Sequence, residues 1–595
     1  MPLNGDISRI NFQSGKVSLS PPPDVAPDEA REAALQAVRD AVQAGEFDRA
    51  GVLAERALRG GFEHSLLLNL YAMSLENAGR LDEAVACLRR AAELAPADIH
   101  ILSALGQCLS GLERPEEALE PFDRALAVDP QFTDAHVNRG AALEAMGRLK
   151  PAEESYRRAL ELQPRHLGAL VGLASIAIRY GEHQEARRLA EAVLKAEPNH
   201  PAAVVGVAAA DLADGRVTEA EARLRMLLDD PRPSPVQKSG AASLLGDVLD
   251  AQGRTQEAFD SYSRVGDDLR RFYAARFEGE ASALHAARWM GAYFEAASPG
   301  AWSPSRAIPA DRAGAREHVF LLGFPRSGTT LLEQALAGHP QVEALSEAET
   351  LIDGVQTFMW RPSGLDRLAG ATEAELRPFR EAYWRRAHEA GARPRGKVFV
   401  DKHPLNTLKL PLIVRLFPQA KILFARRDPR DVVLSCFRRR FRISAPTFEM
   451  LTLEGSAALY DATMRLAARL NELTRLDLCA VSHERLVEDF DGEMGRIWAF
   501  LRLDPAGAPR AFDSRVRERA IATPSAAQLA RGLNAEGVGQ WRRYEAQMRP
   551  VLPVLEPWVR RFGYDATVAE TAAPSEADFG TLPRAVRPAR QSDLA

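Results

Sequence analysis

The residues best suited to chemistry in this chain follow the apolar stretch Val319–Leu322 and begin with a loop that reads GFPRSGTT. The segment after the loop has the pattern of a helix. A strand, a glycine-containing turn and a helix N-terminus can hold an anion, because backbone N–H groups and the helix dipole direct positive potential into the turn. Thr329 occupies the position where an ATP-binding loop carries lysine. We therefore expect an anion with less charge than the β- and γ-phosphates of ATP, such as a phosphate joined to a sulfonate.

Three further groups of polar residues follow in the second half of the chain. Glu347 lies in the stretch HPQVEALSEAET, and Lys402 lies in the motif DKHP at the end of an apolar stretch. Arg427 follows another apolar stretch, and Ser435 comes eight residues later. A carboxylate can accept a proton from a hydroxyl, and a fixed lysine can stabilise charge that develops on an oxygen. The planar fork of an arginine suits a phosphate.

The order of these motifs resembles that of the PAPS-dependent sulfotransferases, over roughly residues 317–564. PAPS is 3′-phosphoadenosine 5′-phosphosulfate, and the resemblance is closest to the tyrosylprotein sulfotransferase branch and its repeat-fused bacterial relatives. It implies an α/β P-loop-type domain with a parallel sheet, and transfer of a sulfonate from PAPS to a hydroxyl acceptor with release of PAP. No metal is implied. The first acceptor to consider is a protein tyrosine.

The resemblance also assigns roles to single residues. It implies that Glu347 is the general base and that Lys402 donates to the oxygen that bridges phosphorus and sulfur. We expect burial beside the cofactor to raise the pKa of Glu347. The residues that it implies for PAPS binding are Arg326, Ser327, Gly328, Thr329 and Thr330 in the loop, Arg427, Ser435 and Arg439 at the 3′-phosphate, and Ser525 and Arg531 in a C-terminal lid.

Several alternatives stay open. The glycine loop could simply connect a strand to a helix, Glu347 could be a surface glutamate, and the arginine-rich stretch could be a solvated helix face. The chain departs from the family at Gln540, where a basic residue is usual, and at His483, where tyrosine is common, which leaves the adenosine contacts open. The alternative functions are a repeat scaffold with a non-catalytic nucleotide-binding domain and a P-loop kinase or NTPase. The alternative acceptors are a glycan, a lipid and a small phenol.

The first half of the chain contains an internal repeat of 34 residues. Residues on this grid are Gly45, Gly79, Glu113, Gly147, Gly181 and Gly215, with alanine five residues after each and proline at 96, 130, 164 and 198. Glycine permits the turn after a first helix, the small alanine allows close helix packing, and proline ends the second helix. The pattern resembles tetratricopeptide (TPR) repeats. We therefore predict an α-helical solenoid of about seven repeats, which serves as a spacer or, as we favour, as a groove for a protein or peptide partner.

Composition narrows the class of protein further. A chain of 595 residues is too long for one core, and its net charge of −5 favours neither nucleic acid nor an anionic membrane. The four cysteines lack zinc or disulfide-framework spacing, which favours a reducing compartment. Neither a signal peptide nor an apolar run of about 18 residues is apparent, so we expect a cytoplasmic protein without a membrane span.

Shifts in periodicity predict the domain boundaries and the elements around the motifs. The predicted segments are a disordered start (1–30), the TPR solenoid (31–268), a helical cap and linker (269–316), the sulfotransferase domain (317–565) and a disordered tail (566–595). The predicted strands of the last domain are 319–322, 398–401, 420–425 and 478–482. Its predicted helices are 330–338, 372–389, 406–416, 430–441 and 455–473.

Overall fold

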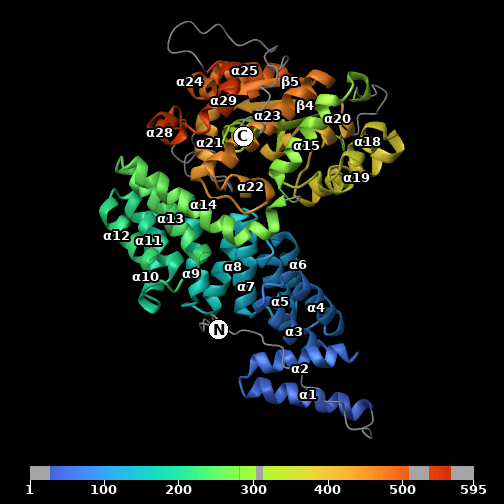
Figure 1. The fold of residues 1–595 in the computed structure, drawn as a ribbon, viewed down its shortest axis with the longest axis vertical. Coiled ribbons are helices and arrows are strands. Elements are labelled where there is room, and N and C mark those ends of the chain that lie inside the picture. The colour runs from blue at the N-terminus through green and yellow to red at the C-terminus, as the bar shows by residue number, and fades with distance from the viewer. Residues whose placement is uncertain (1–26, 280–281, 303–312, 508–534, 536, 565–595) are drawn as a thin grey trace, which may run out of the picture. The chain divides into compact units, whose positions relative to one another are not determined.

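The structure is a computed structural model that describes residues 27–279, 282–302, 313–507, 535 and 537–564 (Figure 1). Packing divides the chain into two compact units, Met1–Ala142 and Leu143–Ala595. The predicted boundaries at residues 268 and 316 separate different kinds of sequence rather than separately packed units, and as domain limits they stay a prediction. The two units are described in turn.

Unit 1 consists of helices that alternate along the chain with short turns. Its helices are α1 (Pro27–Gln43), α2 (Phe47–Arg59), α3 (Ser65–Asn77), α4 (Leu81–Leu94), α5 (Ile99–Gly111), α6 (Pro115–Val128) and the start of α7 (Thr133–Ala145). Buried leucine and alanine side chains from successive helices form its core, with Phe122 fully buried among them. Because each helical pair supplies only one apolar face, the pairs must stack to bury it.

The 34-residue grid has a direct structural cause. Gly45, Gly79, Gly147, Gly181 and Gly215 all lie between the two helices of a pair, with φ angles from 71° to 76°. This left-handed conformation costs glycine little. Glu113 takes the same place in the one slot without glycine and has a φ of 58°. The predicted α-helical TPR solenoid is therefore confirmed, and the turn geometry is kept even where the glycine is lost.

Unit 2 begins with the remaining solenoid helices and a helical extension. These are the end of α7, α8 (Leu149–Leu162), α9 (Leu167–Tyr180), α10 (His183–Ala196), α11 (Pro201–Ala213), α12 (Val217–Asp229), α13 (Pro235–Ala251), α14 (Thr255–Phe277) and α15 (Ala283–Ala296). In α13, Ser234 caps the N-terminus and accepts a hydrogen bond from the amide of Gln237, whose side chain accepts one in return from the amide of Ser234.

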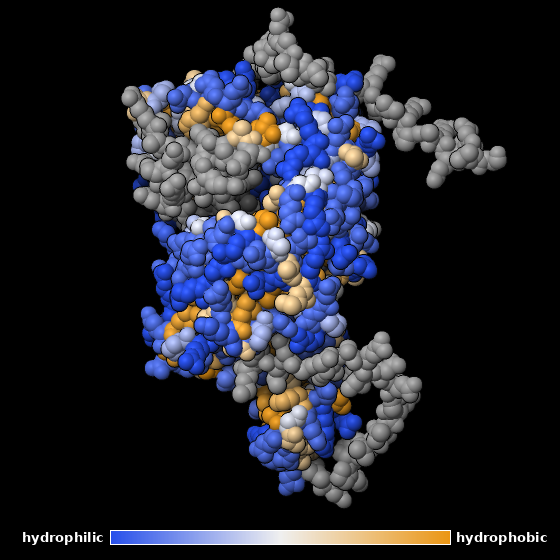
Figure 2. Space-filling view, turned by 90° about the vertical axis from the view of Figure 1, so that its left-hand side faces the viewer, coloured by the Kyte–Doolittle hydropathy of each residue, from blue (hydrophilic) through white to orange (hydrophobic). Residues whose placement is uncertain are grey.

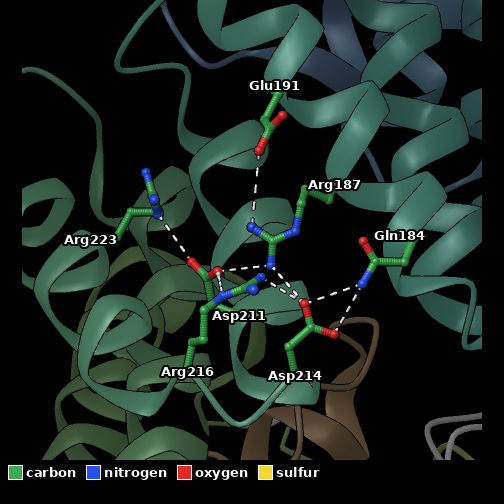
Figure 3. Close-up of polar contacts among 7 residues, drawn as sticks. All are labelled: Gln184, Arg187, Glu191, Asp211, Asp214, Arg216 and Arg223. Atoms are coloured by element: carbon green, nitrogen blue, oxygen red, sulfur yellow. Dashed lines mark hydrogen bonds and ion pairs between the residues drawn. The ribbon is translucent and has the colours of Figure 1, made fainter.

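A buried charge cluster joins three of these helices (Figure 3). The carboxylate of Asp211 on α11 is 3% exposed and lies 2.8 Å from Arg187 of α10 and 3.0 Å from Arg216. Arg223 of α12 approaches its other oxygen at 3.4 Å. Burial opposes ionisation of Asp211, but its hydrogen bonds with Arg187 and Arg216 outweigh this effect and lower its pKa.

The rest of unit 2 is built on a five-stranded sheet with the order β2-β3-β1-β4-β5. The strands are β1 (Glu317–Leu322), β2 (Val342–Ser346), β3 (Val398–Lys402), β4 (Lys421–Arg426) and β5 (Leu478–Ser482), and every neighbouring pair is parallel. The predicted parallel sheet is confirmed, with four strands near the predicted positions. The sequence analysis missed β2, an edge strand with only three apolar residues.

Side chains alternate between the two faces of β1, as strand geometry requires. Phe320 and Leu322 belong to one buried apolar cluster, whereas Val319 and Leu321 belong to another. The helices and short 3-10 turns (η) around the sheet are η2 (Pro299–Trp302), α16 (Thr329–Ala337), α17 (Ile352–Phe358), α18 (Pro362–Gly370), α19 (Glu373–Glu389), η3 (Pro404–Lys409), α20 (Leu410–Leu416), α21 (Pro429–Arg438), α22 (Ala445–Glu449), α23 (Leu453–Thr474), α24 (His483–Glu488), α25 (Phe490–Leu501), η4 (Pro505–Gly507), η5 (Gln540–Tyr544), α28 (Glu545–Met548) and α29 (Leu552–Arg561).

Figure 2 draws one face of the molecule. On the face drawn in Figure 2, hydrophilic side chains predominate and hydrophobic ones occur in small groups. None of the helices that the structure describes combines the length and the apolar character needed to cross a bilayer. Within the same residues, no group of three or more His, Cys, Asp or Glu side chains is placed to hold a metal ion.

Candidate functional site

The phosphate-type loop connects the end of β1 to the start of α16. Gly328 is the N-cap of α16 with a φ of 93°, and Thr329 and Thr330 form the first turn of that helix. Both threonines are buried. The geometry is that of an anion cradle at a helix N-terminus.

Hydrogen bonds within the loop fix its shape. The amide of Phe324 donates to Oγ of Ser327 at 3.0 Å, and the hydroxyl of Ser327 donates to the carbonyl of Phe324. The amide of Gly323 donates to Oγ1 of Thr407 on η3 at 3.1 Å. The resemblance implies that Ser327 binds PAPS. In this structure its hydroxyl instead forms hydrogen bonds within the loop.

Arginine side chains gather beside the loop. Arg326 is 8% exposed and donates through Nε to Oγ of Ser435 at 2.9 Å, which brings the loop and α21 together. Arg427, at the end of β4, is 6% exposed and donates to the carbonyl of Arg326 at 3.1 Å and to that of Gly537. Three residues predicted to bind opposite ends of one nucleotide, Arg326, Arg427 and Ser435, therefore share one cluster.

This cluster has the electrostatics of an anion site. Burial, together with repulsion from Arg439 and Arg427, lowers the pKa of Arg326 to about 9. Nε of Arg427 is buried and has no hydrogen-bond partner among the described residues. A buried donor and crowded positive charges are both relieved by a bound anion. The residues present therefore fit a phosphate group.

Lys402 lies at the carboxyl end of β3, with no exposed side-chain surface. Its ammonium group is 2.6 Å from Oε1 of Glu347 and 3.0 Å from Oε2 of Glu333. Burial opposes the positive charge, but the two carboxylates outweigh it and raise the pKa of Lys402. The structure thus brings together the two residues predicted to carry the chemistry, and it adds a third.

The pKa of Glu347 differs from the sequence-based expectation. Burial alone would raise it, as predicted, but the ammonium group of Lys402 outweighs burial and lowers the pKa below its ordinary value of 4.5. The expectation of a raised pKa is therefore wrong for this arrangement. Its side chain is 42% exposed, so the carboxylate is both ionised and accessible.

The backbone at two site residues is strained. Arg326 has a φ of 70° and Glu347 a φ of 50°, in the left-handed region that side chains other than glycine rarely adopt. The amide of Glu347 donates to the carbonyl of Lys402 at 2.7 Å, which holds the residue in place beyond the end of β2. Such strain is typical of functional positions that the surrounding structure over-determines.

A neighbouring glutamate is a poorer candidate for the base. Glu349 pairs with Lys409 at 2.5 Å and with His403 at 3.2 Å, so its carboxylate is engaged away from Lys402. Asp401, in the same motif as Lys402, is fully buried and accepts hydrogen bonds from Thr350 at 2.8 Å and Tyr383 at 2.9 Å. These contacts leave Glu347 as the carboxylate best placed to accept a proton.

One further predicted site residue, Arg439, and the two residues at which the chain departs from the family, Gln540 and His483, also have defined contacts. Arg439 pairs with Asp247 of α13 at 2.9 Å, and Gln540 accepts a hydrogen bond from Arg438 at 3.3 Å. His483 lies against Gly328, where a side chain on the glycine would come within 2.7 Å of Nδ1. Burial and repulsion from Arg427 lower the pKa of His483 to about 3, so this histidine is neutral.

The segment that contains η5 contacts α21. Asp431 accepts hydrogen bonds from the amides of Gly539 at 2.6 Å and Trp541 at 2.9 Å. Ser525 and Arg531, the predicted lid residues, lie outside the described residues.

The residue that sequence reasoning missed is Glu333. It lies on α16, four residues after Thr329, and α-helical spacing places such residues on the same face. That spacing was the available signal. No charged partner could be inferred for Glu333, because Lys402 lies 69 residues further along the chain.

Comparisons with known proteins match both parts of the chain to families. Residues 318–506 match the sequence profile of the sulfotransferase family, and tetratricopeptide-repeat profiles match residues 63–131, 133–166 and 177–244. The C-terminal part of the chain therefore contains a sulfotransferase-family domain, and the N-terminal part consists of TPR repeats.

Individual relatives are distant. An uncharacterized protein of Aquifex aeolicus is 25% identical over 252 residues, which cover 40% of this chain and 32% of that protein. Protein-tyrosine sulfotransferase 1 of Danio rerio is 24% identical over 260 residues, covering 42% of this chain and 72% of the relative. The crystal structure of a tetratricopeptide repeat protein from Parabacteroides merdae covers 40% of this chain and 93% of that chain, with 20% identity and a TM-score of 0.34.

Proposed function

We propose that this chain transfers a sulfonate group from PAPS to a hydroxyl acceptor, with the solenoid recruiting a protein or peptide. The single observation that carries the proposal is the ion pair of Glu347 and Lys402 at the carboxyl edge of the sheet, next to the helix that starts at the anion loop. A proton acceptor, a fixed cation and an anion cradle are the groups that this reaction needs.

The chain's own residues divide the work. The loop amides, Thr329 and Thr330 would hold the 5′ end of the nucleotide, and Arg427 with Ser435 would hold its 3′-phosphate. When bound, PAPS supplies the sulfonate: the acceptor oxygen bonds to sulfur while the bond from sulfur to the bridging oxygen breaks, leaving its electron pair on PAP. Glu347 takes the acceptor's proton, and Lys402 stabilises the negative charge on the bridging oxygen.

We propose the phenol of a protein tyrosine as the acceptor. The lowered pKa of Glu347 makes its carboxylate a weak base, and a weak base serves a hydroxyl that ionises readily. A phenol, with a pKa of about 10, is far more acidic than a sugar or aliphatic alcohol. The name of the Danio rerio relative points the same way. The alternative acceptors to test beside it are a glycan, a lipid and a small phenol.

The test is turnover of PAPS carrying labelled sulfur by the purified full chain, with tyrosine-containing and serine-containing peptides as acceptors. Transfer to the tyrosine peptide supports the proposal, whereas absence of transfer to every acceptor contradicts it. Thermal shifts with PAP and with ATP distinguish this function from that of a P-loop kinase, because only the kinase should prefer ATP.

Two substitutions separate binding from chemistry. Arg427→Ala should raise KM for PAPS by about 30-fold or more, because it removes a charge-assisted phosphate contact. Glu347→Gln should lower kcat by about 100-fold or more with little change in PAPS binding. Arg485→Ala and Glu349→Gln are matched controls on exposed side chains. Retention of full activity by both site variants would contradict the assignment.

A further inference from the structure

The ammonium group of Lys402 has two carboxylate partners that differ in almost every respect. Glu347 follows an edge strand, has a strained backbone and is 42% exposed. Glu333 lies on α16, is 6% exposed and accepts a hydrogen bond from Oγ of Ser346 at 3.2 Å. The exposed carboxylate can meet an acceptor, whereas the buried one cannot.

Proton transfer would change only one of these partners. Once Glu347 has taken a proton, its carboxyl group is neutral and its attraction for Lys402 is lost. A fully buried ammonium group without a counter-ion is unstable and would shed its own proton. Glu333 has no route to the acceptor through its buried position, and it therefore stays available as a counter-ion.

We propose that Glu333 is a positioning residue, a permanent counter-ion that keeps Lys402 charged and in place while Glu347 gains and loses the acceptor's proton. This inference rests on the proposed function and goes beyond it, because it assigns a role to a second carboxylate. Glu333 comes from the same helix whose N-terminus forms the anion loop, so it also fixes Lys402 relative to the loop.

The substitution Glu333→Gln tests the proposal in the full chain, because it removes the charge and keeps the shape. We expect kcat to fall by about 30-fold or more, with KM for PAPS and the affinity for PAP by calorimetry changed by less than about threefold. Glu343→Gln is the control, because Glu343 also pairs with a lysine, Lys397 at 2.8 Å, but away from the site and with more exposed side chains. This control should retain activity.

The pH dependence gives a readout that a merely structural role would not move. Among the described residues, Glu333 and Glu347 form the ion pairs with Lys402, and both raise its pKa. Lys402 must be protonated to act, so loss of Glu333 should move the alkaline limb of kcat to lower pH. Glu333→Asp, which keeps the charge, should restore the limb at least in part.

Thermal unfolding provides a readout without turnover. A lysine whose pKa is raised in the folded state stabilises the fold below its unfolded value of 10.5, and this contribution is lost as the pH rises through the folded value. The melting temperature of Glu333→Gln should therefore lie below that of the wild type at pH 7, and the gap should narrow above pH 10.5.

The outcomes are distinct. Absence of PAPS turnover by the wild type would reject the proposed function. An active wild type whose Glu333→Gln variant keeps its kcat and its alkaline limb would overturn the role of Glu333. The same holds if Glu333→Asp and Glu333→Gln lose equal activity while the limb stays in place, since a packing defect explains that result.

Discussion

A carboxylate that is paired with an ammonium group is a weak base, and this sets the chemistry open to Glu347. Its partner Lys402 lies 2.6 Å away and favours the ionised form of the carboxylate. The pairing keeps Glu347 ready to accept a proton at neutral pH, at the expense of basicity. Lys402 in turn stays protonated because of its two carboxylates. Glu347 therefore favours the charged form of Lys402, and Lys402 favours the charged form of Glu347.

The lowered pKa of Glu347 predicts where activity fails in acid. The base must be ionised, and its pKa lies below 4.5, so turnover should not depend on its protonation near neutral pH and should fall only below pH 4.5. The measurement is kcat/KM for the acceptor as a function of pH, at saturating PAPS. In the residual activity of Lys402→Met the acid limb should move to higher pH, because the ammonium group no longer favours the carboxylate. A wild-type limb between pH 6 and 7 would contradict this account.

At the site, the sequence could predict residues that belong to motifs but not the contacts between motifs. Glu347 and Lys402 could be named as candidates because each lies in a recognisable pattern, and the structure places them in contact, while their roles stay a prediction. The sign of the pKa shift of Glu347 was beyond reach, because it depends on a distance to Lys402 that no spacing encodes. Glu333 was missed because its contact with Lys402 is likewise not encoded by any spacing. In addition, a glutamate on a helix is usually exposed, so nothing singled it out.

Among the elements, the solenoid helices α10, α11 and α12 are held together by charge as well as by apolar packing. Asp211 is nearly inaccessible, and Arg187, Arg216 and Arg223 surround it (Figure 3). Removing the one buried carboxylate would leave Arg187 and Arg216 with the more exposed Asp214 and would take the carboxylate at 3.4 Å away from Arg223. Weaker compensation of partly buried positive charges is costly.

We expect Asp211→Asn to destabilise the chain by about 2 kcal/mol at pH 7, less than for a fully buried pair because Arg216 and Arg223 are partly exposed. The pKa of Asp211 is lowered, so its stabilising contribution is present above the ordinary value of 3.8 and is lost as the pH falls through the folded value. The gap in melting temperature between variant and wild type should therefore narrow in acid.

Asp214→Asn is the control for this prediction, because Asp214 contacts Arg187 and Arg216 but is 24% exposed. Its effect should be clearly smaller. Equal melting temperatures for Asp211→Asn and the wild type at pH 7 would show that the cluster adds nothing.

Secondary structure was predictable where a residue type has a fixed backbone role. The glycine grid gave the solenoid, because each of these glycines adopts the left-handed turn that its position requires. The edge strand β2 was not predictable, since Glu343 and Ser346 interrupt its apolar pattern. Tertiary pairing with β3, from Val342 to Ser346, is what makes it a strand.

At the scale of the molecule, the last solenoid helices and the sheet domain share one core within unit 2. A single apolar cluster runs from Val204 of α11 to Phe562 after α29. Figure 1 shows α13 and α14 beside α21 and α22, and Phe259 of α14 contacts Phe437 of α21 with ring centroids 5.0 Å apart. The repeat profile ends at residue 244 and the sulfotransferase profile begins at residue 318, and this apolar cluster contains residues from both matched regions.

Polar contacts reinforce this junction and connect it to the site. Asp250 of α13 pairs with Arg438 at 2.7 Å and with Arg543 at 2.5 Å, and it accepts a hydrogen bond from Tyr544 at 2.7 Å. Arg438 is close in sequence to Ser435, and Arg439 pairs with Asp247. The solenoid helix α13 thus contacts the end of α21, the helix that carries Ser435, which we propose binds the 3′-phosphate.

Two fragments test whether the shared core defines the folding unit. Residues 133–595, which begin with α7, keep every residue of the cluster that starts at Val204, and we expect this fragment to unfold cooperatively and to retain PAPS turnover. Residues 269–595 begin with the predicted helical cap and linker, directly after the predicted solenoid, and contain the whole predicted sulfotransferase domain (317–565), yet they lack the cluster's side chains from α11 to α14. That fragment should aggregate or bind a hydrophobic dye, because the apolar surface left behind has no cover.

The comparison is informative because a shared core and an independent domain predict different behaviour for the shorter fragment. If the sulfotransferase domain were an independent module, residues 269–595 would melt cooperatively and turn over PAPS as well as the longer fragment does. Circular dichroism melts and turnover measured on both fragments decide between these cases. Asp250→Ala in the full chain adds a finer probe, because it leaves the buried Arg438 with only the carboxylate of Asp247 at 3.9 Å. The melting temperature should fall and KM for PAPS should rise, because the end of α21 is held less firmly.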